Sequence, residues 1–104
     1  MSKRIMYLRD ATYHPVGCIA MVIDRTKERA EYQVSVLNPQ DQFDRKTARL
    51  LCLERLVDHP ITVRITGNGS FHTIAQAVME DLIKSKCPSR AVRAAKLWMR
   101  LNVT

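Results

Sequence analysis

The sequence lacks a long apolar run, which bears on membrane insertion. Its longest stretches without a charged residue are 65–79 and 11–23, and glycine or proline interrupts both of them. A membrane-spanning helix needs about 20 consecutive, mostly apolar residues. At the N-terminus, the basic segment 1–4 leads into only a short apolar segment before Arg9 and Asp10, which is not the pattern of a signal peptide. We therefore expect a soluble, intracellular protein with no membrane partner.

Cysteine and histidine are too sparse and too scattered for a disulfide framework or a zinc site. The three cysteines, Cys18, Cys52 and Cys87, form no C-x-x-C pair. The three histidines stand at no zinc-like spacing to them. We expect the cysteines to be small buried thiols in a reducing compartment, and we expect no metal.

Signatures of catalysis are missing as well. No Ser/His/Asp arrangement has local support, and no pair of acids stands in an apolar context. The turn Thr66–Ser70 is rich in glycine, but it lacks the lysine of a Walker loop and the third glycine of a dinucleotide fingerprint. We predict a plain turn in which Ser70 caps a helix, and an incidental phosphate contact stays open. We expect neither an enzyme nor a cofactor.

Acidic residues are absent from the end of the chain, although the net charge is +7. Residues 83–104 hold six bases and no acid, whereas residues 1–82 hold the other eleven bases and all ten acids, a balance of +1. The six bases are Lys84, Lys86, Arg90, Arg93, Lys96 and Arg100. The basic character is thus a property of the C-terminal segment.

Hydrophobic periodicity predicts seven elements in one domain, 1–104. Strands are expected over 5–8, 16–23, 32–36 and 61–65, and helices over 38–57, 71–83 and 89–101. The order β-β-β-α-β-α-α predicts an α+β fold with a single, mostly antiparallel sheet packed by helices on one face. Polar residues on two of the strands leave the other face at least partly exposed. The pattern is also compatible with a homodimer through that face or through an edge strand, although nothing in the chain requires one.

The middle helix, 38–57, begins with chemistry typical of a helix start. Pro39 suits a first turn, and Asn38 or Asp41 is expected to cap it. Its predicted apolar face consists of Phe43, Thr47, Leu50 and Val57, widened by Leu51 and Leu53. Its basic residues are Arg45, Lys46 and Arg49. For these bases a solvated surface is the simplest interpretation, and an acidic ligand is the alternative.

The pattern Asn38-Pro39-x-Asp41-x-Phe43-x-Arg45-Lys46-x-x-Arg49, followed by Arg55-Leu56, resembles a helix of small uncharacterised proteins of bacteriophages and mobile elements. Ala48 departs from that pattern, in which glycine is common at the corresponding position. The resemblance covers about a fifth of the chain, 38–56. It implies a phage-type origin and hence the cytoplasm of a bacterial host cell. It implies no activity and no site residues.

The last predicted helix combines an apolar face with a basic stripe. Ala91, Ala94, Ala95, Trp98 and Leu101 define the apolar face, so we expect the helix to be folded against the domain. Trp98 is interpreted as a core anchor, with base stacking or an interface contact as the alternative. Opposite this face, the stripe consists of Arg93, Lys96 and Arg100, with Arg90 at its margin. Such a stripe can follow a phosphate backbone, contact an acidic protein surface or remain solvated.

The leading hypothesis is a small phage-type accessory protein that binds DNA or RNA non-specifically through phosphate contacts. The predicted contacts are the six bases of the C-terminal segment, with Arg45, Lys46, Arg49 and Arg64 as additions. The alternative is a protein-binding modulator, such as an inhibitor or a host-takeover factor, that docks on an acidic surface of a host enzyme or complex.

Overall fold

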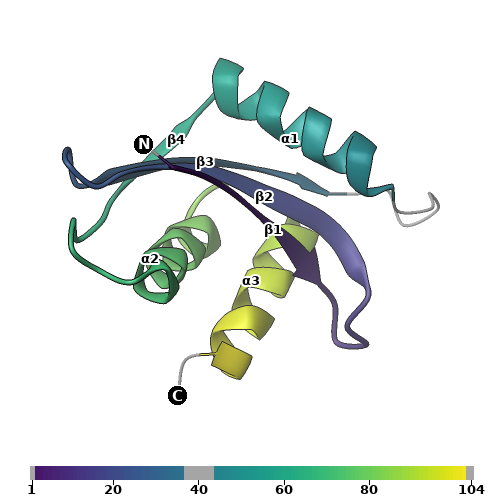
Figure 1. The fold of residues 1–104 in the computed structure, drawn as a ribbon. Coiled ribbons are helices and arrows are strands. Elements are labelled where there is room, and N and C mark those ends of the chain that lie inside the picture. Colours follow the sequence, from purple (N-terminus) through teal and green to yellow (C-terminus); the bar gives the residue numbers. More distant parts are fainter. Residues whose placement is uncertain (1, 37–43, 103–104) are drawn as a thin grey trace.

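One antiparallel sheet organises the molecule. The computed structural model of the chain describes residues 2–36 and 44–102. The sheet has four strands, β1 (Ser2–Arg9), β2 (Pro15–Asp24), β3 (Arg29–Val36) and β4 (Ile61–Arg64), in the spatial order β1-β2-β3-β4 (Figure 1). Each strand is antiparallel to its neighbours. Together with three helices, this confirms the predicted α+β class and the β-β-β-α-β-α-α order.

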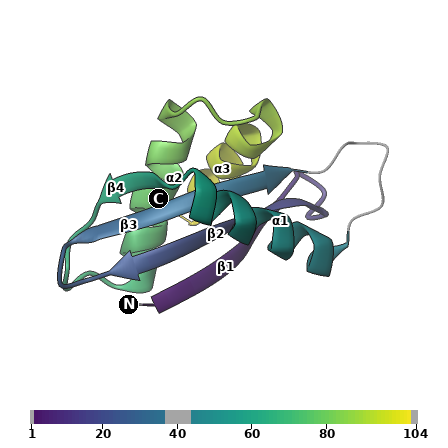
Figure 2. The same cartoon turned by 90° about the horizontal axis from the view of Figure 1, so that it is seen from above.

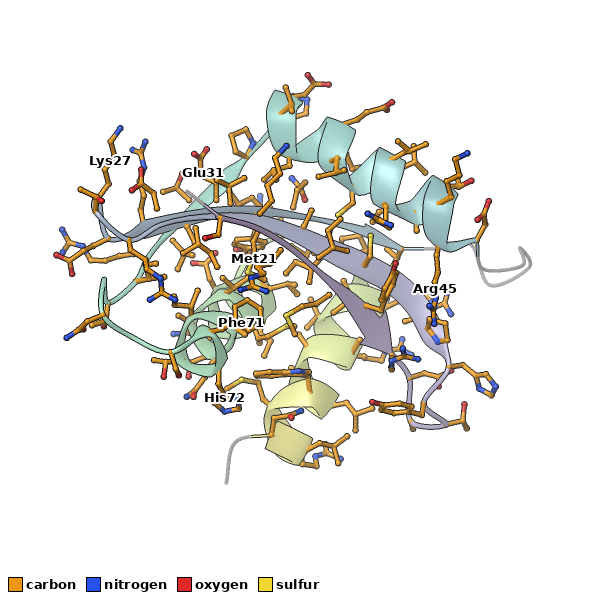
Figure 3. All side chains as sticks on the ribbon, in the orientation of Figure 1. Met21, Lys27, Glu31, Arg45, Phe71 and His72 are labelled. Carbon is orange, nitrogen blue, oxygen red and sulfur yellow. The ribbon has the colours of Figure 1, made fainter. Side chains whose placement is uncertain are left out.

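The helices cover both faces of the sheet, which differs from the expectation that all would lie on one face. Helices α2 (Phe71–Lys84) and α3 (Ser89–Asn102) pack on one face, as expected, whereas α1 (Arg45–Asp58) lies across the other (Figures 1 and 2). Side chains of a strand alternate between faces, so β2 serves both layers. Its Met21 points toward α2 and α3 (Figure 3), while its Cys18 and Ala20 pack against α1.

The face that α1 buries is not the predicted one. The structure buries Ala48, Cys52 and Leu56, whereas Val57 is 81% exposed and Leu50 is 54% exposed. The physical reason is the surface that α1 meets, because Cys18 and Ala20 are small and let small helix residues approach the sheet closely. Of the predicted face, Leu53 is partly buried against this cluster, whereas Leu50, Leu51 and Val57 are left facing solvent.

The beginning of α1 also differs from the prediction. The helix starts at Arg45 and its N-cap is Asp44, whose side chain accepts a hydrogen bond of 3.1 Å from the Lys46 N–H. The predicted caps Asn38 and Asp41, and the predicted face residue Phe43, lie outside the described residues.

The last two helices complete the main core on the opposite face. The Ser70 hydroxyl caps α2, accepting a hydrogen bond of 3.2 Å from the Thr73 N–H, as predicted. In α3 the alanines of the predicted apolar face are buried against the core, Trp98 is half-buried, and Leu101 is 63% exposed. The C-terminal helix is therefore packed on the domain. None of the helices formed by the described residues is at once long and apolar enough to span a bilayer.

Candidate functional site

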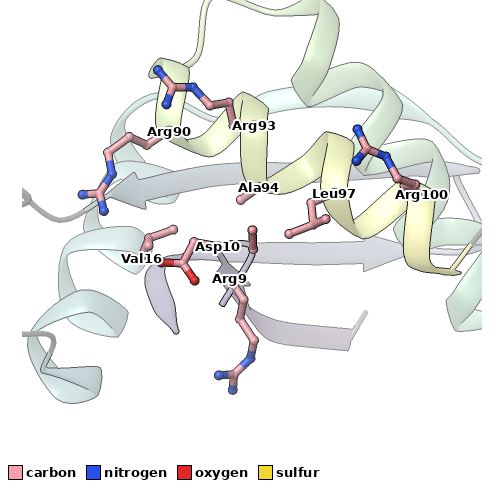
Figure 4. Close-up of a pocket in the computed structure, with 9 residues that line it drawn as sticks. Arg9, Asp10, Val16, Arg90, Arg93, Ala94, Leu97 and Arg100 are labelled. Carbon is pink, nitrogen blue, oxygen red and sulfur yellow. The ribbon is translucent and has the colours of Figure 1, made fainter. Parts of the chain in front are cut away.

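A pocket of about 450 Å³ lies between α3 and the connection from β1 to β2 (Figure 4). We call it the arginine pocket. Its lining residues are Arg9, Asp10, Ala11, Val16, Arg90, Arg93, Ala94, Leu97 and Arg100. Four guanidinium groups and one carboxylate give this lining a formal charge of +3. Segments from the two ends of the chain thus form one strongly basic site.

The arginines of α3 reach the pocket because of their spacing. Arg93 and Arg100 are seven positions apart, close to two helical turns, and Arg90 precedes Arg93 by three. Ala94 and Leu97 lie between them, and the arginine side chains spread outward along the rim rather than meeting at one point (Figure 4). This arrangement suits several anionic groups in a row better than one small anion.

The β1–β2 connection is held in shape by Asp10. Its Oδ1 accepts hydrogen bonds from the Thr12 N–H, the Thr12 hydroxyl and the His14 N–H, at 2.9, 2.7 and 3.0 Å. The hydrogen bonds from the Thr12 side chain and the His14 backbone hold the pKa of Asp10 below its ordinary value of 3.8. The carboxylate therefore stays ionised at neutral pH and is already engaged within the turn.

Arg9 is positioned by the same connection. Its Nη1 donates a hydrogen bond of 3.2 Å to the Tyr13 carbonyl oxygen, and its Cζ lies 4.7 Å from the centroid of the Tyr13 ring. Cation–π contacts of this kind favour a fixed orientation of the guanidinium over the ring. Tyr13 itself has a φ of 66°, a left-handed conformation that is uncommon for a residue with a bulky side chain.

The structure gathers some of the predicted basic residues and separates others. Arg90, Arg93 and Arg100 share the arginine pocket, and Lys96 is exposed on the same helix outside the pocket lining. Lys84 and Lys86 are exposed where α2 leads into α3. On α1, across the sheet, the exposed bases are Arg45, Lys46 and Arg49, and Arg64 lies on β4 at the edge opposite β1.

Arg9 and Asp10 were missed by the sequence reasoning. Arg9 ends β1 and Asp10 follows it directly, and nothing in the sequence around Arg9 distinguishes it from the other bases of the chain. Arg9 and Asp10 lie near α3 because of how this helix packs across the sheet. The spacing of residues within one element does not predict that packing. The only available signal was the connection itself, because loops between rigid elements often carry binding residues.

The glycine-containing turn before α2 is hydrogen-bonded by the side chain of Arg25. The Arg25 guanidinium donates hydrogen bonds to the carbonyl oxygens of Gly67 and Gly69, and the Gly69 N–H donates to the Thr66 carbonyl. The turn therefore directs two carbonyl oxygens at a cation of its own chain. This supports the interpretation of a plain turn.

The thiols of the two central cysteines are hydrogen-bonded inside the fold. Cys18 and Cys52 are fully buried, and the Cys52 thiol donates to the Gln33 carbonyl at 3.0 Å. The hydrogen bond with Cys18, and then burial, raise the pKa of Cys52 above its ordinary 9.0. Within residues 2–36 and 44–102, no group of three or more His, Cys, Asp and Glu side chains could hold a metal ion.

Comparison with known proteins leaves the arginine pocket as the main guide to function. No protein family, no curated protein and no solved structure matches the chain.

Proposed function

We propose that the chain is a small phage-type accessory protein, rather than an enzyme, that binds nucleic acid through phosphate contacts in the arginine pocket. The observation that carries this proposal is the lining of that pocket, in which four arginines from the two ends of the chain surround one concave site. Arginine presents a planar fork of donors that fits phosphate oxygens in a bidentate manner. The site would act in the cytoplasm of a bacterial host cell.

The form of the site supports a polymer of phosphates over a single anion. The arginines are spread along more than two turns of α3 and across to β1, so no single phosphate can engage them all. The one acid of the lining, Asp10, accepts hydrogen bonds from its own turn and lowers the formal charge of the lining only to +3. Binding of this kind depends on charge and geometry and is largely independent of sequence.

Fluorescence anisotropy with short labelled oligonucleotides tests the proposal. We expect binding in the micromolar range at about 50 mM salt, with an affinity that falls steeply as salt is raised. The double variant Arg93→Gln/Arg100→Gln should lose at least about tenfold in affinity and lower the slope of log Kd against log salt by about 1.5. The control Arg49→Gln/Arg64→Gln removes the same charge from other surfaces and should change both quantities much less.

The results separate three cases. Absence of binding by the unaltered protein at low salt would overturn the proposed function. Equal losses of affinity in the two double variants would show that the overall charge attracts the nucleic acid and that the arginine pocket is not its binding site. A selective loss in Arg93→Gln/Arg100→Gln would support the pocket as the site.

A second candidate function is favoured by the outer surface of α1. Val57, Leu50 and Leu51 are 81%, 54% and 43% exposed, which places large apolar side chains in solvent. Exposed apolar residues that gather on one element often mark a protein contact. If the chain is a modulator of a host protein, a nuclease-treated host lysate should yield a stoichiometric partner. The variant Leu50→Ser/Val57→Ser should lose that partner, while Arg93→Gln/Arg100→Gln should keep it.

A further inference from the structure

We infer that the arginine pocket continues into a base-binding pocket, so that the preferred ligand is a single-stranded nucleic acid rather than a duplex. This inference rests on the proposed function and narrows it. Phosphates would lie along the arginines, and an unpaired base would enter the neighbouring pocket.

The neighbouring pocket has a volume of about 350 Å³, and we call it the edge pocket. It is lined by the run 5–10 and by Tyr13 on one side, and by α3 residues that include Leu97, Trp98 and Leu101 on the other. It shares Arg9, Asp10, Ala94 and Leu97 with the arginine pocket. The two pockets are therefore parts of one groove between β1 and α3, with four arginines in one part and with Tyr13, Trp98 and the edge of β1 in the other.

The edge pocket runs along the outer edge of β1. Six consecutive residues, Ile5 to Asp10, line it. Because side chains of a strand alternate between faces, consecutive residues share one pocket along the edge of the strand. Within the part of the chain that the structure describes, β1 is an outer strand of the sheet and pairs with β2 alone. Its outer N–H and C=O groups are thus placed to meet the edge of a base, which carries both donors and acceptors.

Tyr13 supplies an aromatic surface beside these groups. The residue is 69% exposed and lines the edge pocket, and Arg9 lies over its ring at 4.7 Å. The Asp10 turn holds Tyr13 in its left-handed conformation, and strained backbone of this type clusters at binding sites. An aromatic ring next to a guanidinium is the combination on which single-stranded bases stack.

The wall opposite β1 is apolar. Leu97 and Trp98 are half-buried, and Leu101 is 63% exposed. The Trp98 ring also lies 5.6 Å from the His72 ring on α2, so it forms a fixed wall rather than a free stacking surface. A flat, largely apolar base with polar edges fits a groove with an apolar wall, an aromatic ring and a main-chain edge.

These features favour a single strand because duplex bases are already stacked and paired. A duplex would offer its phosphates to the arginines and nothing to the edge pocket, whereas a single strand offers both. An extended acidic peptide is the competing ligand, since it could pair with β1 as an added strand and meet the arginines with its carboxylates. The exposed aromatic ring beside the arginines argues for the base.

The test compares four ligands, of which the two single strands differ only in the presence of bases. Three labelled oligonucleotides of 12 nucleotides are used: an oligo(dT) single strand, a duplex, and a strand of abasic residues with the same phosphates. The fourth ligand is a labelled 12-residue polyglutamate peptide. We expect oligo(dT) to bind about tenfold tighter than the abasic strand, which corresponds to one stacked base. The duplex should resemble the abasic strand, and the peptide should bind more weakly than oligo(dT).

Tyr13 variants locate the effect in the edge pocket. Tyr13→Asn removes the ring and keeps a residue that tolerates positive φ. It should weaken binding of oligo(dT) by about five- to tenfold and leave the abasic strand unchanged. Tyr13→Phe keeps the ring and should bind like the unaltered protein.

Each other outcome has a distinct meaning. If the abasic strand and the duplex bind as well as oligo(dT), the inference is wrong and the proposed function stands. If no oligonucleotide binds, both the inference and the proposed function are overturned. If polyglutamate binds tighter than every oligonucleotide, the groove is a site for strand addition and the inference is overturned.

Discussion

The Tyr32 hydroxyl on β3 donates a hydrogen bond to Oδ2 of Asp81 on α2, with an oxygen–oxygen distance of 2.6 Å. Tyr32 is fully buried at the centre of the core cluster between the sheet and the C-terminal helices. The Ser85 hydroxyl, at the end of α2, lies 3.3 Å from the same phenolic oxygen. The pair therefore joins the sheet to the helix that precedes the basic helix α3.

We predict that Tyr32→Phe destabilises the protein by about 1–3 kcal/mol at pH 7, because Asp81 loses a partly buried donor. Burial, and then the hydrogen bond with Asp81, raise the pKa of Tyr32 above its ordinary 10.0. The folded state thus holds this proton more tightly than the unfolded state. This contribution to stability is fully present below pH 10 and is lost as the pH rises above it.

Denaturant titrations from pH 7 to pH 11 check this prediction. The difference in the free energy of unfolding between Tyr32→Phe and the unaltered protein should become smaller above pH 10, by about 1 kcal/mol per pH unit. Tyr13→Phe changes an exposed tyrosine and should leave stability unaltered at every pH. A difference for Tyr32→Phe that stays constant up to pH 11 would contradict the role given to its ionisation.

The two sides of α1 provide a second prediction. Leu56 is 7% exposed and packs against β2, whereas its neighbour Val57 is 81% exposed. Leu56→Ala should cost about 2–5 kcal/mol through lost burial and a residual cavity. Val57→Ala should change the free energy of unfolding by no more than about 0.5 kcal/mol. Thermal or denaturant unfolding measures both, and a larger loss for Val57→Ala would restore the face predicted from the sequence.

Local patterns predicted the sheet well because each strand carries its own signal. Tyr32, Val34 and Val36 alternate with polar residues, and all three face the core formed with α2 and α3. The element order followed from such signals, since each depends on near neighbours in the sequence. The same holds for Ser70, whose capping role depends only on residues of the next helical turn.

The face of α1 could not be predicted from its own residues. Two sets of residues recur at helical spacing: Leu50 and Val57, which are large and apolar, and Ala48, Cys52 and Leu56, of which the first two are small. Size favours the first set, but Cys18 and Ala20 of the sheet accept the second. The residues of the arginine pocket could be predicted only in part, for a similar reason. The spacing within α3 groups its arginines, whereas Arg9 joins them only through the packing of α3 across the sheet.

A third prediction concerns the single acid of the arginine pocket. Asp10→Asn removes a negative charge and keeps an oxygen that can accept the hydrogen bonds from Thr12 and His14. Affinity for a labelled oligonucleotide should rise by a few-fold at low salt and converge with that of the unaltered protein as salt screens the charge. Asp58→Asn makes the same charge change at the exposed end of α1 and serves as control. An equal rise in both variants would assign the effect to overall charge.

The last prediction concerns the reactivity of the three thiols. Cys18 and Cys52 are fully buried, and the Cys18 thiol donates a hydrogen bond of 3.2 Å to the Ala48 carbonyl. Cys87 is half-buried in the connection between α2 and α3. Burial, and then the Asp81 charge, raise the pKa of Cys87 above its ordinary 9.0, so its thiolate fraction at neutral pH is small.

A thiol reagent should therefore modify one cysteine per chain in the native protein, slowly at pH 7 and faster as the pH rises. The other two should react only when denaturant opens the packing of α1 on the sheet, because their sulfur atoms lie between these layers. Cys87→Ser should abolish the native reaction and leave two thiols per chain in denaturant. Native modification of Cys18 or Cys52 at a rate similar to that of Cys87 would mean that α1 separates from the sheet far more readily than its buried contacts imply.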